Sequence, residues 1–443
     1  MPFIVFYVSL YLLLAVSWKL SKCDVLSPNV LICASFIGAA TMYILGSERL
    51  EAQTFTAKTT SYLLLGILVF ILGSETCKVV VKSIRKYSDK RQYTAFVGDG
   101  IKPINLPIFF YVGFSALVII TTALQIYHVK QMVGGSIITA LSIYRSETLL
   151  EGKSAHSIVS LLSRVIYGIQ PVLLFSMFYN KYIAKRKFRH PVLGGVAMVI
   201  YMMALYLISG SRGKVFAVFF QVLFAVTLTL NYGGNIFRDH FRSGEKKGNK
   251  FWIKAVVIIA VIGIPLFYYG GVIGGRNYSQ ISAFQSVENY FSYGLIRINL
   301  IVSKINTVAS ENWGQWSFPG IYSVLNKMNL IFTGSYDFFP FYKNYGNTVT
   351  IFGRWFVDFG LTGLVIMSYL SGLFYSYIYY RLKYTPSRKM AVRYSCLYIF
   401  LYSAIIMASY DDWVRSVMTL NGIFQIIILM FMENRVYKKY IKS

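Results

Sequence analysis

The chain has 443 residues, of which 56% are hydrophobic and only 14% charged, and its mean hydropathy is +0.54. A water-soluble surface needs roughly a quarter of its residues charged, so these figures exclude a soluble globular protein, a disordered chain, a collagen and a coiled coil. The net charge of +27 invites a nucleic-acid-binding interpretation, which the distribution of charge must test.

Apolar runs long enough to cross a bilayer, about 20 residues each, follow one another along the chain. They predict about eleven transmembrane helices, over residues 3–18, 29–46, 58–80, 105–127, 157–180, 191–209, 214–231, 252–273, 356–380, 391–409 and 414–432. The first run lacks the basic start and the cleavage site of a signal peptide, so we expect it to be a span. The four cysteines are widely scattered, with no metal-ligand spacing, and we expect free thiols.

Basic residues gather in every second connection between the runs. These connections hold Lys and Arg residues over 19–22, 82–102, 181–189, 238–254, 381–393 and 435–442. The pattern places these segments in the cytoplasm, with the amino terminus outside and the carboxy terminus inside. Short clusters at membrane edges explain the positive charge as topology, with attraction to anionic headgroups as a secondary effect, and argue against nucleic-acid binding.

The expected fold class is therefore an all-α polytopic membrane protein with one large loop on the outer, periplasmic side. The expected parts are a first bundle of about eight spans (1–273), the loop (274–355) and a last group of about three spans (356–443). Within the loop, Tyr290–Val302 and Tyr322–Phe332 have the pattern of amphipathic helices lying at the interface.

Aromatic residues are dense in this loop and include Trp313, Trp316, Tyr336 and Tyr345. They suit either an interfacial aromatic belt or a platform on which sugar rings pack.

Several arginines fall at or near the outer ends of the runs: Arg164, Arg212, Arg276, Arg297, Arg354 and Arg415. Arginine suits bidentate binding of phosphate oxygens, although each one singly suits a structural salt bridge or a snorkelling role equally well. Together they predict an anionic ligand at the outer leaflet, most simply a lipid-linked phosphate or pyrophosphate. No metal or nucleotide-binding motif is present in the sequence.

The acids and histidines expected on that side are potential general bases: Asp337, Asp358, Asp411, Asp412, Glu147, Glu151, His128 and His156. Asp411 precedes Arg415 by four residues, which favours a structural ion pair. Asp358 could instead mark a helix-packing site together with Gly360 and Gly363.

Three features resemble the Wzy-type oligosaccharide repeat-unit polymerases of O-antigen and capsule assembly. One is the turn Ser209–Gly213 (SGSRG), similar to an S-x-R-G/S motif. Another is Gly346–Thr350 (GNTVT) followed by Asp358–Gly363 (DFGLTG), similar to an N-T-x-T…D-x-G-x-x-G motif at the end of the large loop. The third is the span count with one dominant late loop.

The resemblance implies a glycosyltransferase in the bacterial cytoplasmic (inner) membrane that uses undecaprenyl-pyrophosphate-linked glycans as donor and acceptor and needs no cofactor or metal. Carried over to this sequence, it assigns pyrophosphate binding to Arg212 and Arg354, with Arg276 behind them and Arg164 as a buried supporting charge. Asp358 is the first candidate base and His156 the second. A chain-length regulator is a candidate partner.

Two other enzymatic or transport functions remain open. O-antigen ligases carry a histidine in their large outer loop, and this loop has none. A lipid-linked oligosaccharide flippase would be expected to show internal repeats, which we do not see. A structural membrane subunit is the remaining alternative.

Overall fold

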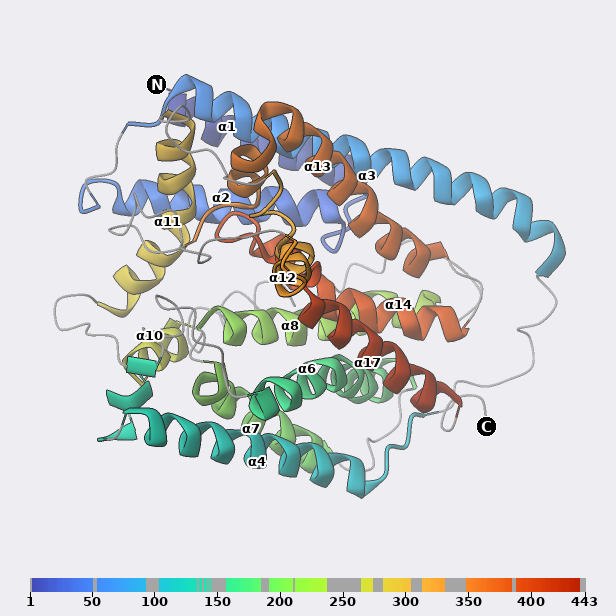
Figure 1. Cartoon of the computed structure of the whole chain (residues 1–443). Helices are drawn as coiled ribbons and strands as arrows, with labels where there is room; N and C mark the ends of the chain where they lie inside the picture. Colours follow the sequence, from blue (N-terminus) through green and yellow to red (C-terminus); the bar gives the residue numbers. More distant parts are fainter. Residues whose placement is uncertain are drawn as a thin grey trace. The chain divides into compact units, whose positions relative to one another are not determined.

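The computed structural model describes residues 2–50, 54–92, 103–133, 135–137, 139–141, 143–144, 157–184, 191–209, 212–236, 264–273, 282–303, 313–330, 348–384 and 388–438. Every regular element within these ranges is helical (Figure 1). The helices are α1 (Pro2–Leu20), α2 (Pro28–Gly46), α3 (Ala57–Gln92), α4 (Ile108–Val133), α6 (Ser157–Phe178), the π-helix η1 (Tyr179–Ile183), α7 (Pro191–Ser209), α8 (Arg212–Ile236), α10 (Ile264–Ile273), α11 (Ala283–Ser303), α12 (Pro319–Lys327), α13 (Ile351–Tyr384), α14 (Arg388–Leu401), α15 (Ser403–Ile406), α16 (Trp413–Val417) and α17 (Leu420–Val436).

Eight helices in the described ranges are long and apolar enough to cross a membrane, and each coincides with one of the expected runs. The run at 191–209 coincides with α7 (Pro191–Ser209). Only residues 264–273 of the run at 252–273 are described, and the last run is divided between α16 and α17. The all-α, multi-pass membrane class is thus confirmed, while the count of eleven and the orientation remain predictions.

The outer faces of these helices fit that environment. On α1, Ile4, Val8 and Leu12 are 54–64% exposed, and α4 exposes Phe109 and Val112 to a similar degree. Apolar side chains in such number would be unfavourable in water and are stable against acyl chains.

The chain forms two compact units that interleave along the sequence. Unit 1 comprises Met1–Arg91, Phe284–Tyr384 and Leu401–Ile423, and unit 2 comprises Gln92–Ala283, Thr385–Phe400 and Phe424–Ser443. The three consecutive parts expected from the sequence remain a prediction.

In unit 1, α3 and α13 cross at small residues. A Cβ atom added to Gly73 would lie 2.3 Å from the Tyr369 carbonyl oxygen, and one added to Gly372 would lie 2.2 Å from that of Phe70. Ser376 donates a hydrogen bond of 2.6 Å to Ser74 at the same crossing. Small residues with one hydroxyl pair are the usual means of close helix contact in a membrane.

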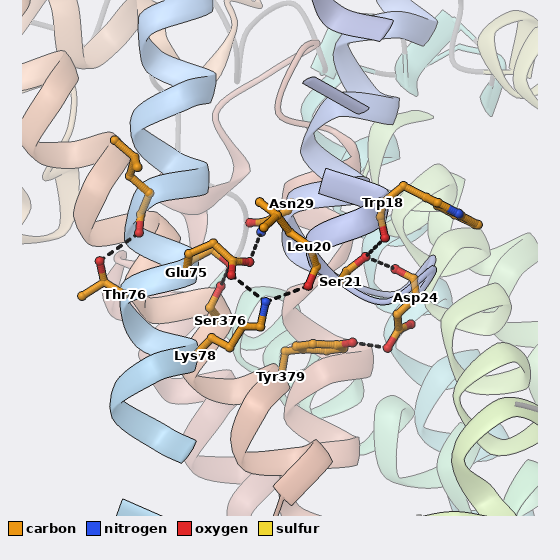
Figure 2. Close-up of polar contacts among 12 residues, drawn as sticks. Trp18, Leu20, Ser21, Asp24, Asn29, Glu75, Thr76, Lys78, Ser376 and Tyr379 are labelled. Carbon is orange, nitrogen blue, oxygen red and sulfur yellow. Dashed lines mark hydrogen bonds and ion pairs between the residues drawn. The ribbon is translucent and has the colours of Figure 1, made fainter. Parts of the chain in front are cut away.

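A polar network joins the turn after α1 to α2, α3 and α13 (Figure 2). Lys78 binds Glu75 at 2.6 Å and the Leu20 carbonyl at 2.7 Å, which satisfies an open carbonyl at the end of α1. Asn29 donates to Glu75 at 2.9 Å, and Asp24 accepts from the Tyr379 hydroxyl. The network holds the turn after α1 against α2, α3 and α13.

The two helices expected in the large loop are present in shifted form. Helix α11 covers 290–302 completely, but most of its residues are buried inside the protein, unlike those of a helix lying on the membrane surface. Helix α12 runs from Pro319 to Lys327, so it overlaps only the first part of the expected 322–332.

In unit 2, α4 packs against α6 and α7. Asn180 in η1 binds both main-chain groups of Ile104 at 2.7 Å, and Arg393 in α14 pairs with the fully buried Glu433 in α17 at 3.2 Å. These contacts fix the segment before α4 and the end of α17.

Candidate functional site

The site begins with a break in α13. Gly360 has φ 66° and ψ −157°, a conformation that is essentially restricted to glycine, and it divides the helix into residues 351–359 and 361–384. The first part carries Arg354 and Asp358 four residues apart, hence on one face. Both side chains are buried, at 6% and 7% exposure.

Arg354 forms an ion pair with Asp411, whose Oδ1 lies 3.1 Å from the guanidinium Nη2. Asp411 and Asp412 follow the turn after α15, and this turn is held to the start of α13 by a hydrogen bond of 2.8 Å from the Ile351 N–H to the Ala408 carbonyl. The Asp412 N–H donates to Asp411 Oδ1 at 2.9 Å. This main-chain contact therefore helps to position both carboxyl groups near Arg354.

A second arginine enters from α11. Tyr290 stacks on Tyr410 with ring centroids 3.7 Å apart, and Gly294 lies against the Ser409 carbonyl, so that α11 packs directly on the turn. Arg297, one helical turn further and only 1% exposed, is near enough to Asp411 for its charge to act on that carboxyl.

Burial affects the pKa of Asp411 more strongly than these guanidinium groups do. Loss of hydration raises the pKa of Asp411 although Arg354 and Arg297 both oppose the shift. The same burial, together with the charges of Asp411 and Asp358, raises the pKa of Asp412 to about 8, against the opposing effect of Arg354. Asp412 is therefore mostly protonated at neutral pH, and it gains or loses its proton at a pH only slightly above neutral.

Asp358 has a different environment. Its Oδ1 accepts the Trp316 N–H at 3.2 Å and its Oδ2 accepts the Ser317 N–H at 2.6 Å. Asp358 thus holds the turn before α12, which also carries Trp313. Trp313 packs edge-on against Phe359 with centroids 4.6 Å apart and is nevertheless 75% exposed.

The structure brings together four of the predicted site residues in unit 1: Arg354, Asp358, Trp313 and Trp316. Arg164 lies in α6 of unit 2, half-buried, with its Nη2 2.9 Å from Ser160 Oγ. Arg212 is the first residue of α8, also in unit 2. His156, Arg276, Tyr336 and Tyr345 lie outside the described residues, so their assignments remain predictions.

The sequence placed Arg297 among the arginines expected to bind an anion and Asp411 and Asp412 among the potential bases, but the family resemblance assigned none of the three a role. Asp411 pairs with Arg354, which is 57 residues away, and the sequence spacing pointed only to the local neighbour Arg415. Arg297 does have a sequence signal, because an arginine inside the apolar segment Tyr290–Val302 needs a buried partner just as Arg164 does.

No family model, curated protein or solved structure matches this chain. Within the described ranges, no group of three or more His, Cys, Asp or Glu side chains could hold a metal ion. The residues of unit 1 supply two buried guanidinium groups, a carboxyl with a pKa of about 8 and an exposed indole. This combination can bind an anion, accept a proton and pack against a sugar ring.

Proposed function

We propose that the chain is a lipid-donor glycosyltransferase that polymerises undecaprenyl-pyrophosphate-linked repeat units into O-antigen or capsular polysaccharide at the outer face of the cytoplasmic membrane. The observation that carries the proposal is the buried group formed by Arg354, Arg297, Asp411 and Asp412 beside the Asp358 turn. Two of the motif residues that resemble the Wzy-type polymerases, Asp358 and Gly360, build its frame.

In the proposed reaction, a hydroxyl of the acceptor sugar attacks the anomeric carbon of the donor glycan. The new bond joins that carbon to the acceptor oxygen, while the bond from the carbon to the pyrophosphate oxygen breaks. The electron pair leaves with undecaprenyl pyrophosphate, and guanidinium groups stabilise its developing charge. Arg354 is the group in unit 1 that we assign to this role, while the assignments of Arg212 and Arg276 remain predictions from the sequence.

The attacking hydroxyl must lose its proton, and a carboxyl with a pKa near the working pH is best suited to accept it. Asp412 meets that condition in its ionised form. Asp358, whose two oxygens accept main-chain N–H groups, is better suited to positioning the turn that carries Trp313 and Trp316. We therefore assign proton acceptance to Asp412, and His156 remains the alternative base.

The test is a polymerisation assay with the full chain in nanodiscs and lipid-linked repeat units as substrate. We expect a ladder of longer glycans from the wild type, about 10²–10³-fold less product from Arg354→Ala, and partial activity from Arg354→Lys. Lys58→Ala, which removes an exposed cation at the start of α3, is the matched control and should leave the ladder unchanged.

An unchanged ladder from Arg354→Ala would remove the pyrophosphate assignment. Glycan transferred only to a lipid A core acceptor would identify a ligase. Translocation of intact substrate without chain extension would identify a flippase.

A further inference from the structure

A groove of about 840 Å³ opens in unit 2, between the start of α4 and the end of α17. Leu106, Phe109, Phe110 and Phe431 form its apolar walls, and Arg435 and Lys438 also line it. Among the residues that the structure describes, the lining contains these two cations and no carboxylate. The groove therefore combines an apolar wall with a pair of cations.

Contacts of buried residues next to the lining hold the two walls in place. Both main-chain groups of Ile104 are bound by Asn180 at 2.7 Å, and Ile104 and Leu106 are almost fully buried. On the other wall, Glu433 is turned inward to Arg393, so the acid nearest to Arg435 in the sequence is fully buried. The Arg435 guanidinium lies 5.1 Å from the centre of the Phe431 ring, which keeps it above the apolar wall.

The exposure of the lining indicates what kind of molecule covers it. Phe109 is 69% exposed and Phe431 55%, and both belong to apolar helices of a membrane protein, so acyl chains rather than water are the favourable contact. Arg435 and Lys438 are exposed three residues apart, and so on one side of the helix end. Charge complementarity with these two cations favours an anion attached to the acyl chains.

We propose that this groove is a binding site for a phospholipid with a net anionic headgroup, whose phosphate lies between Arg435 and Lys438 and whose acyl chain packs on Phe109, Phe110 and Phe431. The proposal does not depend on the glycosyltransferase function, because all of these residues belong to unit 2 and none is part of the Arg354 site.

The experiment uses the purified full chain in a neutral detergent, titrated with phosphatidylglycerol or with phosphatidylcholine of the same acyl chains. Native mass spectrometry measures the first bound lipid, and thermal unfolding measures its stabilising effect. We expect phosphatidylglycerol to bind more tightly and to raise the unfolding temperature, and added salt to weaken this preference.

Each basic residue near a lipid phosphate contributes about fivefold in affinity, so R435Q/K438Q should lose roughly 30-fold for phosphatidylglycerol and little for phosphatidylcholine. The charge-preserving variant R435K/K438R should retain most of the affinity. K19Q/K22Q removes two exposed cations from unit 1 and is the matched control, which should bind as the wild type does.

Three results would overturn the proposal: equal binding of the two lipids, equal losses from K19Q/K22Q and R435Q/K438Q, or wild-type binding by R435Q/K438Q. Displacement of the lipid by millimolar glycerol phosphate would also overturn it, since it would show a site for the free anion with no part for the acyl chain.

Discussion

Asp412 is the residue in which burial and charge compete most directly. Among the described residues, the groups that act on it include Arg354 and Asp358 from α13, Asp411 beside it and Tyr375 from the second part of α13, with Arg297 acting on Asp411. Of these, the Arg354 guanidinium lowers the pKa of Asp412, while the two other carboxylates raise it together with burial. The result is an acid that changes charge close to pH 8 rather than near its ordinary value of 3.8.

This pKa predicts opposite pH trends for activity and stability. The folded state holds a proton that the unfolded chain releases above pH 3.8, so stability should fall as pH rises toward about 8, by up to about 1.4 kcal/mol per pH unit. Activity should rise over the same window as the ionised base forms. Asp412→Asn should cost about 10²–10⁴-fold in polymerisation and flatten the decline in unfolding temperature between pH 6 and 8. A variant with the wild-type pH profile would contradict the assignment.

Asp358 gives a separate prediction, because its carboxylate anchors the turn of Trp316 and Ser317. Asp358→Ala removes both acceptors and should reduce activity roughly 10–100-fold, the effect of losing one or two charge-assisted hydrogen bonds. Asp358→Asn retains one acceptor oxygen and should lose less. Tryptophan fluorescence provides a second measurement, since only the alanine variant should show a clear shift in emission. Equal, near-complete inactivation of both variants with unchanged fluorescence would instead support Asp358 as the base.

At the scale of the element, the break at Gly360 decides where the site can form. Without it, residues 351–384 would form one continuous helix of 34 residues, and Arg354 and Asp358 would share the axis of the membrane span. With it, the short buried part is free to direct Arg354 and Asp358 toward α11, α12 and the turn after α15.

Gly360→Ala should therefore be strongly disruptive. No atom lies within 4 Å of a Cβ added at this position, so the cost comes from the backbone conformation alone, about 1–3 kcal/mol. We expect a lower unfolding temperature and loss of polymerisation. Gly38→Ala is the control, because Gly38 in α2 also has open space around it and has no positive φ; wild-type stability in both variants would contradict the argument.

The ion pair of α14 with α17 gives the second prediction at this scale. Glu433 is fully buried, so removing its partner in Arg393→Ala leaves a buried acid and should destabilise unit 2 by on the order of 2–4 kcal/mol. The double variant Arg393→Met with Glu433→Leu should be closer to the wild type, since it removes both charges. Thermal unfolding in detergent measures the difference, and a double variant less stable than Arg393→Ala would refute it.

The same elements show what the sequence could predict. Apolar length alone located α1, α2, α3, α4, α6 and α8, because a span has to satisfy its own backbone and needs no information from distant residues. The partner of Asp411 and the burial of α11 depend on segments far away in the chain, and local spacing carries no information about them. The sequence identified Gly360 as part of a motif, but it did not predict the helix break, because the break depends on the fold around that residue.

For the whole molecule, interleaving of the two units means that neither can be removed by cutting the chain at one point. Unit 1 needs helices from the start of the chain and from its last third, and α11, from the large loop, contributes to its buried residues. The large loop is thus partly a structural component of the bundle, which explains how a loop segment can present Arg297 at full burial.

Cys23 offers a direct way to determine which side of the bilayer the turn after α1 faces. Of the four cysteines it alone is exposed, while Cys33, Cys77 and Cys396 are buried. The natural chain therefore already contains a single thiol that a membrane-impermeant maleimide can reach, without any engineered substitution. If the positive-inside pattern holds, the maleimide should label Cys23 only after the cells have been opened. Labelling in intact cells would show that every helix has the opposite orientation.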